Sequence, residues 1–166
     1  MRRMRTFRAG TLNIWSRFGP WEERLAAIRA GLKKVAPDVI GMQEVLDYQG
    51  FDQGALVADG LGYHVAWGEA SENHGFPTGN AILSRWPIAR KEVIPLPHGE
   101  SDERRSILFA EPLREPERRI DYVFVRGPDD SQRGEPRDAR VCFDEPHEGT
   151  FPSDHFGVVC TITAGR

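Results

Sequence analysis

The chain has 166 residues, the length of one domain, and at this size folding buries roughly 70% of the surface of the unfolded chain, so a core can form without disulfides or metal ions. Hydrophobic residues make up 39% and charged residues 28%, the balance of an ordinary soluble domain. The formal net charge of −3 excludes a global basic field that attracts nucleic acid. A bound divalent cation can still supply positive charge to a phosphate-bearing substrate.

The cysteines and the first residues exclude further classes of protein. Cys142 and Cys160 lie in apolar runs and are interpreted as small buried hydrophobes, because two cysteines make neither a disulfide framework nor a zinc site. Residues 1–5 are basic, but no long apolar stretch follows them. We therefore expect neither a signal peptide nor a transmembrane helix, and we expect a cytoplasmic protein.

The first forty residues predict a strand–helix–strand unit. Alternating apolar positions predict a strand over residues 7–15, and Gly19-Pro20 then forms a turn. Pro20 suits the first turn of a helix, and Pro37 ends that helix. Between them, apolar residues recur at helical spacing at Leu25, Ile28, Leu32 and Val35. A short apolar run over residues 39–43 predicts a buried second strand, which completes a βαβ-like unit.

The remainder of the chain predicts one short helix followed by strands. The helix covers residues 52–61 and contains two glycines. Short strand candidates, separated by Gly, Pro and polar residues, follow at residues 63–67, 80–84, 90–95, 106–111, 120–125, 137–143 and 157–163. Helices early and hairpin-like strands later predict an α+β or layered α/β domain.

Two polar residues close the first two predicted strands. The amide of Asn13 can hydrogen-bond a phosphate oxygen or steady a metal ligand, and the alternative is a turn-former that begins the loop. Glu44 projects a carboxylate from the edge of the predicted sheet. Magnesium often takes only one or two protein carboxylates, so Glu44 is a candidate ligand. The alternative is a solvated glutamate at a strand end.

Two further candidates lie late in the chain. Asp121 interrupts an apolar strand candidate, and because an unpaired buried carboxylate is costly it needs a partner, either Arg119 or a histidine. Asp154 and His155 precede the last strand, and histidine can exchange a proton near neutral pH. Neighbours on an extended segment point different ways, so Asp121 rather than Asp154 is expected to orient the His155 ring. The alternative is a turn that carries a lone histidine.

Five short motifs, in this order, carry a family resemblance. They are Asn13 after the first strand, Gln-Glu after the second, Gly-Asn-Ala-Ile-Leu-Ser-Arg at residues 79–85, Ile-Asp-Tyr-Val-Phe at 120–124 and Ser-Asp-His at 153–155. Together they resemble the endonuclease/exonuclease/phosphatase family of metal-dependent phosphoesterases, which includes pancreatic-type deoxyribonuclease, apurinic endonucleases, sphingomyelinases and inositol-polyphosphate phosphatases. The resemblance spans residues 6–163 and implies a four-layer α/β sandwich, in a single domain of residues 1–166.

The resemblance also implies a role for each candidate residue. Glu44 would be the principal ligand of Mg²⁺ or Mn²⁺, with Asp154 beside the metal or the attacking water. Asp121 would orient His155, which would act on the nucleophile or on the phosphoryl oxygen. Asn13 would help to hold phosphate or metal. The ion would stabilise negative charge on the phosphoryl oxygens.

One segment departs from the family pattern. In the family, a long segment with a Thr-His-Leu motif, a helix and a Gly-Asp-Phe-Asn motif separates the strands that match residues 106–110 and 120–125, but here only residues 111–119 remain. We interpret this as an internal deletion that removes the carboxylate and amide beside the nucleophilic water and a histidine beside the phosphate. The second half of the sandwich is then incomplete, and either the remaining strands close up or partner copies of the chain cover the exposed sheet.

Three functions follow from these motifs. The leading one is a magnesium-dependent phosphoesterase, a hydrolase with a reduced active site and impaired activity. A non-catalytic binding relative and a truncated product without independent activity are the alternatives, and measurements of metal binding and turnover separate the three. The motifs do not choose between nucleic-acid, lipid and sugar phosphates. The absence of a basic cluster disfavours a processive nuclease.

Overall fold

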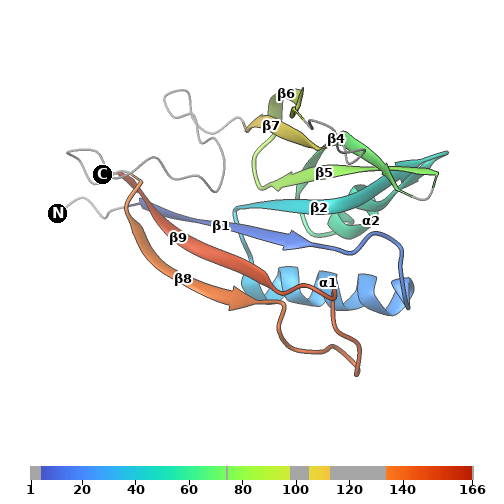
Figure 1. Ribbon diagram of the computed structural model, residues 1–166. Helices are drawn as coiled ribbons and strands as arrows, with labels where there is room; N and C mark the ends of the chain where they lie inside the picture. Colours follow the sequence, from blue (N-terminus) through green and yellow to red (C-terminus); the bar gives the residue numbers. More distant parts are fainter. Residues whose placement is uncertain (1–4, 74, 98–104, 113–133, 166) are drawn as a thin grey trace.

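The computed structural model describes residues 5–73, 75–97, 105–112 and 134–165, which form a mixed α/β arrangement (Figure 1). Its elements, in chain order, are β1 (Arg5–Asn13), α1 (Trp21–Val35), β2 (Val39–Tyr48), β3 (Phe51–Asp52), α2 (Gln53–Ala58), β4 (His64–Asn73), β5 (Phe76–Ser84), β6 (Ile88–Pro95), β7 (Ser106–Pro112), β8 (Pro136–Cys142) and β9 (Gly157–Gly165). The strand predicted over residues 120–125 lies outside the described residues.

The larger sheet runs in the order β4-β5-β2-β1-β9-β8, with β3 paired to β2. β1 and β2 are parallel, and Ala9 of β1 pairs with Val39 of β2. The other pairs along this sheet are antiparallel. The predicted strand–helix–strand unit is thereby confirmed, because α1 connects the two parallel strands as a crossover.

Local sequence explains where α1 begins and ends. Acidic Glu22 and Glu23 occupy its first turn and basic Lys33 and Lys34 its last, which complements the helix dipole. Ala36 takes a left-handed conformation and donates its backbone N–H to the Leu32 carbonyl at 2.8 Å, so the helix ends just before Pro37, as predicted.

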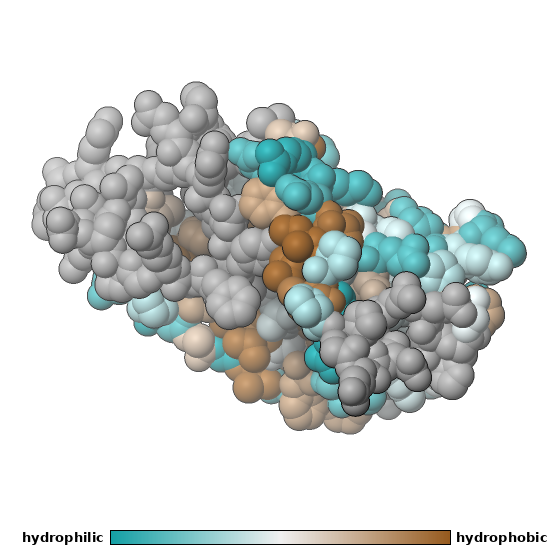
Figure 2. Space-filling view, turned by 45° about the horizontal axis from the view of Figure 1, so that its top comes forward, coloured by the Kyte–Doolittle hydropathy of each residue, from teal (hydrophilic) through white to brown (hydrophobic). Residues whose placement is uncertain are grey.

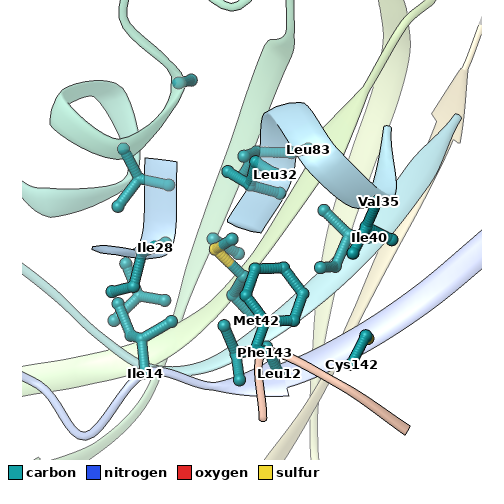
Figure 3. Packing of buried hydrophobic residues seen from close by; sticks show 14 of the residues in the cluster. Leu12, Ile14, Ile28, Leu32, Val35, Ile40, Met42, Leu83, Cys142 and Phe143 are labelled. Carbon is teal, nitrogen blue, oxygen red and sulfur yellow. The ribbon is translucent and has the colours of Figure 1, made fainter. Parts of the chain in front are cut away.

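The main core lies between the helices and one face of the larger sheet (Figure 3). Ile28, Leu32 and Val35 of the predicted stripe are buried there, and Leu25 packs partly against them. The sheet contributes Leu12, Ile40, Met42 and Leu83, and Ile14 follows directly after β1. Burial of this set supplies the hydrophobic driving force that fixes α1 beneath β1 and β2.

The hairpin of β6 and β7 packs on the opposite face, at the β4–β5 end of the sheet. Ser106 connects the layers, because its hydroxyl donates to the Glu69 carbonyl at 3.0 Å and its carbonyl accepts from Asn80 Nδ2 at 3.0 Å. Gly68 allows the close approach, since a Cβ there would lie 2.5 Å from Val93 Cγ2. The described residues thus confirm the predicted layered α/β class.

Apolar side chains also reach the surface, as the brown areas of Figure 2 show. The exposed ones include Val93, Ile94 and Ile107 on the β6–β7 hairpin and Val141 and Val158 on β8 and β9. Val141 and Val158 are partners in the β8–β9 ladder, so they form one exposed pair. Within the described chain, neither helix is both long and apolar enough to cross a membrane.

Candidate active site

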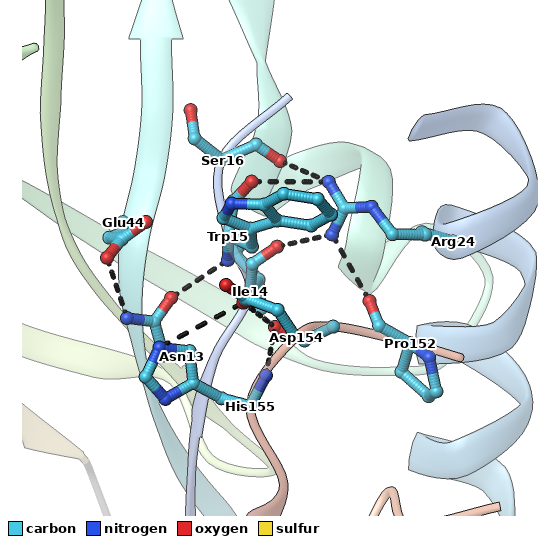
Figure 4. Close-up of polar contacts among 10 residues, drawn as sticks. Asn13, Ile14, Trp15, Ser16, Arg24, Glu44, Pro152, Asp154 and His155 are labelled. Carbon is cyan, nitrogen blue, oxygen red and sulfur yellow. Dashed lines mark hydrogen bonds and ion pairs between the residues drawn. The ribbon is translucent and has the colours of Figure 1, made fainter. Parts of the chain in front are cut away.

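Asn13 and Glu44 meet where the parallel pairing of β1 and β2 stops, because β1 ends at Asn13 while β2 continues to Tyr48. Asn13 is the last residue of β1, and its Nδ2 donates to Glu44 Oε1 at 2.8 Å (Figure 4). Its Oδ1 accepts from the Trp15 backbone N–H at 2.8 Å. Asn13 therefore forms the turn that its residue type favours and also hydrogen-bonds the Glu44 carboxylate, while its role toward a phosphate or a metal stays a prediction.

A bulge in β2 sets the direction of the Glu44 side chain. The β2–β5 register shifts between Met42 and Val45, so Gln43 and Glu44 together face one residue of β5. Glu44 itself has a left-handed backbone, with φ of 58°. Such a conformation is unfavourable for a side chain with a Cβ and persists only where the surrounding structure imposes it.

The second half of the site is the loop before β9. Ser153 is buried, its hydroxyl donates to Asp154 Oδ1 at 3.1 Å, and it accepts from the His155 backbone N–H at 3.2 Å. His155 Nε2 lies 3.9 Å from Asp154 Oδ1, which is too long for a hydrogen bond. Asp154 therefore does not fix the imidazole by hydrogen bonding. Asp121, predicted for that task, and Arg119 lie outside the described residues.

Arg24 of α1 lies between the two halves and was not among the predicted site residues. Arg24 is 2% exposed, and its side chain donates to the carbonyl oxygens of Ile14, Trp15, Ser16 and Pro152, as Figure 4 shows. It also donates to the carbonyl oxygen of Phe18. Burial lowers the pKa of the Arg24 guanidinium, and the negative charge of Asp154 opposes that shift. The sequence does carry a signal for Arg24. It is a charged residue three positions after Trp21 and four before Ile28, which is a core position of the apolar stripe.

Gln53, at the start of α2, is a second buried polar residue that sequence reasoning missed. It is fully buried, its Oε1 accepts from the Leu46 backbone N–H at 2.8 Å, and its Nε2 donates to the Ser16 carbonyl at 2.7 Å. Gln53 thus ties the continuation of β2 to the loop that follows β1.

Other acidic residues and a histidine near the loop before β9 are solvent-exposed. Asp144, Glu145 and His147 are exposed, and Glu145 pairs with Lys34 at 2.5 Å. His74 and His98 fall outside the described residues. In the part of the chain that the structure describes, no group of three or more His, Cys, Asp or Glu side chains gathers closely enough to hold a metal ion. The predicted ligands Glu44 and Asp154 are therefore not part of a larger described cluster.

Comparison with known proteins places this arrangement in a family. The sequence profile of the endonuclease/exonuclease/phosphatase family matches residues 10–118. The chain therefore belongs to the endonuclease/exonuclease/phosphatase family. A search of curated protein sequences found no match.

Solved structures agree on the fold. An endonuclease/exonuclease/phosphatase family protein from Leptotrichia buccalis C-1013-b superposes with a TM-score of 0.68 at 13% identity, covering 94% of this chain and 99% of that one. TDP2 from C. elegans gives a TM-score of 0.62 at 16% identity, with 96% and 75% covered. A humanized TDP2 from D. rerio gives 0.64 at 14% identity, with 96% and 99% covered. The predicted fold of the endonuclease/exonuclease/phosphatase type is thus confirmed.

Proposed function

We propose that this chain is a divalent-metal-dependent phosphoesterase with a reduced active site, in a single domain over residues 1–166. The observation that carries the proposal is the 2.8 Å hydrogen bond from Asn13 Nδ2 to Glu44 Oε1, where the parallel pairing of β1 and β2 stops, in a member of this family. In this proposal Asn13, Glu44, Asp154 and His155 form the site, together with Asp121.

The donor atoms fit a hard divalent cation. Glu44 supplies a carboxylate whose direction is fixed by Asn13 and by the bulge in β2. Oxygen ligands suit Mg²⁺ or Mn²⁺, and magnesium commonly binds one or two protein carboxylates with water and substrate oxygens completing its shell. Glu44 and Asp154 would hold the ion. Once bound, it would supply the positive charge that stabilises the phosphoryl oxygens.

The protein's own groups would have distinct tasks. Asn13 orients the Glu44 carboxylate through its amide. The His155 side chain is 56% exposed, so its imidazole can reach substrate and exchange protons with it. The Asp154 side chain beside it is 44% exposed, and its proposed task is to contact the metal or the attacking water.

The reduced activity follows from what the sequence lacks. Neither a Thr-His-Leu nor a Gly-Asp-x-Asn motif occurs in the sequence, so the water-positioning carboxylate and amide of the family have no counterpart. Losing one preorganised transition-state contact commonly lowers the rate by about 10²–10³. We expect weak metal binding and slow turnover of a phosphoester whose class is open. A cytoplasmic location and a second copy that covers the exposed apolar side chains stay predictions.

Hydrolysis of bis(p-nitrophenyl) phosphate with Mg²⁺, with Mn²⁺ and with EDTA tests the proposal. We compare the natural chain with Glu44→Gln, His155→Ala and, as a matched control, Glu145→Gln. Glu145 pairs with Lys34 in the last turn of α1, at the other end of that helix from Arg24. We expect slow metal-dependent turnover that Glu44→Gln lowers by about 10²–10³ and that Glu145→Gln leaves unchanged.

Turnover that survives both Glu44→Gln and His155→Ala contradicts the assignment of the site. Metal binding without turnover, in a folded chain, indicates the non-catalytic binding relative. A folded chain that shows neither metal binding nor turnover indicates a product without independent activity.

A further inference from the structure

We infer that Arg24 is a positioning residue that holds the two halves of the candidate active site in register. The inference rests on the proposed function. Arg24 makes no hydrogen bond to Glu44 or to His155 among the described contacts. Arg24 contacts the backbone on both sides, so it acts through the segments that carry the functional side chains.

On one side, Arg24 fixes the turn that follows β1. Its Nη1 donates to the Ile14 carbonyl at 2.7 Å, and its Nη2 donates to the Ser16 carbonyl at 2.9 Å and to the Trp15 carbonyl at 3.2 Å. The Trp15 N–H donates in turn to Asn13 Oδ1. The guanidinium is therefore connected to the Glu44 carboxylate through one turn and the Asn13 amide.

On the other side, Arg24 holds the loop before β9. Its Nη1 donates to the Pro152 carbonyl at 3.2 Å, a contact that spans 128 positions in the chain. The next residue, Ser153, organises the backbone of His155 and the carboxylate of Asp154. One guanidinium thus reaches the segments of Asn13 and of His155 at once.

The chemistry of this contact requires arginine. The guanidinium presents its donors as a planar fork, and here they serve carbonyl oxygens that point at it from several directions. The rings of Trp15 and Trp21 lie 4.9 and 5.5 Å from its central carbon and add cation–π attraction. Trp15 and Ser16 have left-handed backbones, with φ of 55° and 42°, and Arg24 binds both of their carbonyls. A lysine has three donors on a point charge and cannot reproduce the fork.

A purely structural arginine would satisfy these carbonyls without affecting the site, and a matched pair of variants separates the two roles. Arg24→Lys removes the guanidinium that hydrogen-bonds the backbone of both halves of the site. Arg85→Lys changes an arginine that also donates to a backbone carbonyl, that of Leu61, and lies over an aromatic ring, that of Tyr63 at 3.9 Å. The readouts are kcat and KM for bis(p-nitrophenyl) phosphate, and the nuclear magnetic resonance signals of the Asn13 side-chain amide and the His155 imidazole.

We expect Arg24→Lys to lower kcat by about 10²-fold with little change in KM, since a displacement of about 1 Å at a site can lower the rate by that factor. We also expect it to shift the Asn13 and His155 signals together, whereas Arg85→Lys changes neither kcat nor those signals. The spectra report on Arg24 even if the natural chain shows no turnover. In that case the proposed function fails, while the positioning role is still tested by the two signals.

Unchanged Asn13 and His155 signals in a folded Arg24→Lys chain would overturn the inference. Equal losses of kcat in Arg24→Lys and Arg85→Lys would overturn it as well, because they would show a general effect of stability. If Arg24→Lys does not fold, Pro152→Gly serves instead, since it keeps Arg24 and the accepting carbonyl but gives the backbone that presents this carbonyl more conformational freedom. We then expect the His155 signal to move and the Asn13 signal to stay, and movement of neither would overturn the inference.

Discussion

The two halves of the candidate site are built in opposite ways. Asn13 and Glu44 belong to adjacent parallel strands, and Ile14 and Met42 beside them are fully buried in the core. Asp154 and His155 belong to a loop, and their side chains are 44% and 56% exposed. Glu44, the principal proposed metal ligand, is thus preorganised by the sheet, whereas the second proposed ligand, Asp154, lies in the loop. The group proposed to handle protons depends on the local contacts of one loop, so the two halves should respond differently to substitution.

The largest expected effect is on the core beneath the first half. Leu32→Ala should lower the free energy of unfolding by roughly 2–5 kcal/mol, because Leu32 is fully buried between α1 and the sheet and its truncation leaves a cavity. Val158→Ala, at an exposed residue of β9, should change it by less than about 0.5 kcal/mol. Denaturant titration of both variants measures the difference. A loss below about 1 kcal/mol for Leu32→Ala would show that this face does not form the core.

The next largest effect is on turnover, and it compares the loss of one hydrogen-bonding side chain in each half of the site. Asn13→Ala removes the donor to Glu44 Oε1, and a hydrogen bond to a charged group is worth about 1.5–3 kcal/mol, so turnover should fall by about 10- to 100-fold. Ser153→Ala removes the donor to Asp154 Oδ1 and the acceptor of the His155 backbone N–H, but water can replace both in this exposed loop, and turnover should fall by less than about tenfold. Steady-state assays with the phosphodiester measure both. A larger loss for Ser153→Ala would reverse the comparison.

The smallest effect concerns backbone strain in the first half. Glu44→Ala and Glu44→Gly both remove the carboxylate, but only glycine relieves the left-handed backbone at φ of 58°. The glycine variant should therefore be more stable than the alanine variant by about 1 kcal/mol. Thermal or denaturant unfolding of the pair measures this difference. Equal stabilities would mean that the bulge in β2 carries no strain at this residue.

The sequence predicts the regular parts of this fold well, for identifiable reasons. The helix over Trp21–Val35 has an apolar stripe, charges that match its dipole and a proline beyond its end, and these signals agree. The sequence does not predict that β2 continues to Tyr48, because Gln43 and Glu44 break the apolar run and only the bulge lets Val45 pair with β5. The short strand β3 was also missed, since two residues carry no periodicity.

The site follows from the sequence less completely. Asn13 and Glu44 were predicted as strand-end residues, and Asn13 does end β1, whereas Glu44 lies at the bulge inside β2. Their contact follows because Asn13 pairs with Gln43, the residue before Glu44. Arg24 was missed because a single charge in an apolar stripe is ordinarily read as a surface residue, and its acceptors are backbone carbonyls that no side-chain motif encodes. The pairing of Asp121 with His155 stays a prediction.

Paramagnetic broadening by Mn²⁺ tests most directly whether both halves of the site face one divalent cation held by Glu44. At substoichiometric Mn²⁺, we expect loss of nuclear magnetic resonance intensity for the Asn13 side-chain amide and the His155 imidazole. The Tyr63 ring, which lies against Arg85, serves as the control and should keep its intensity. The same titration of Glu44→Gln should leave all three signals intact. Broadening of Asn13 and His155 that persists in Glu44→Gln, or broadening confined to exposed carboxylates such as Glu145, would show that Glu44 does not hold an ion between the two halves.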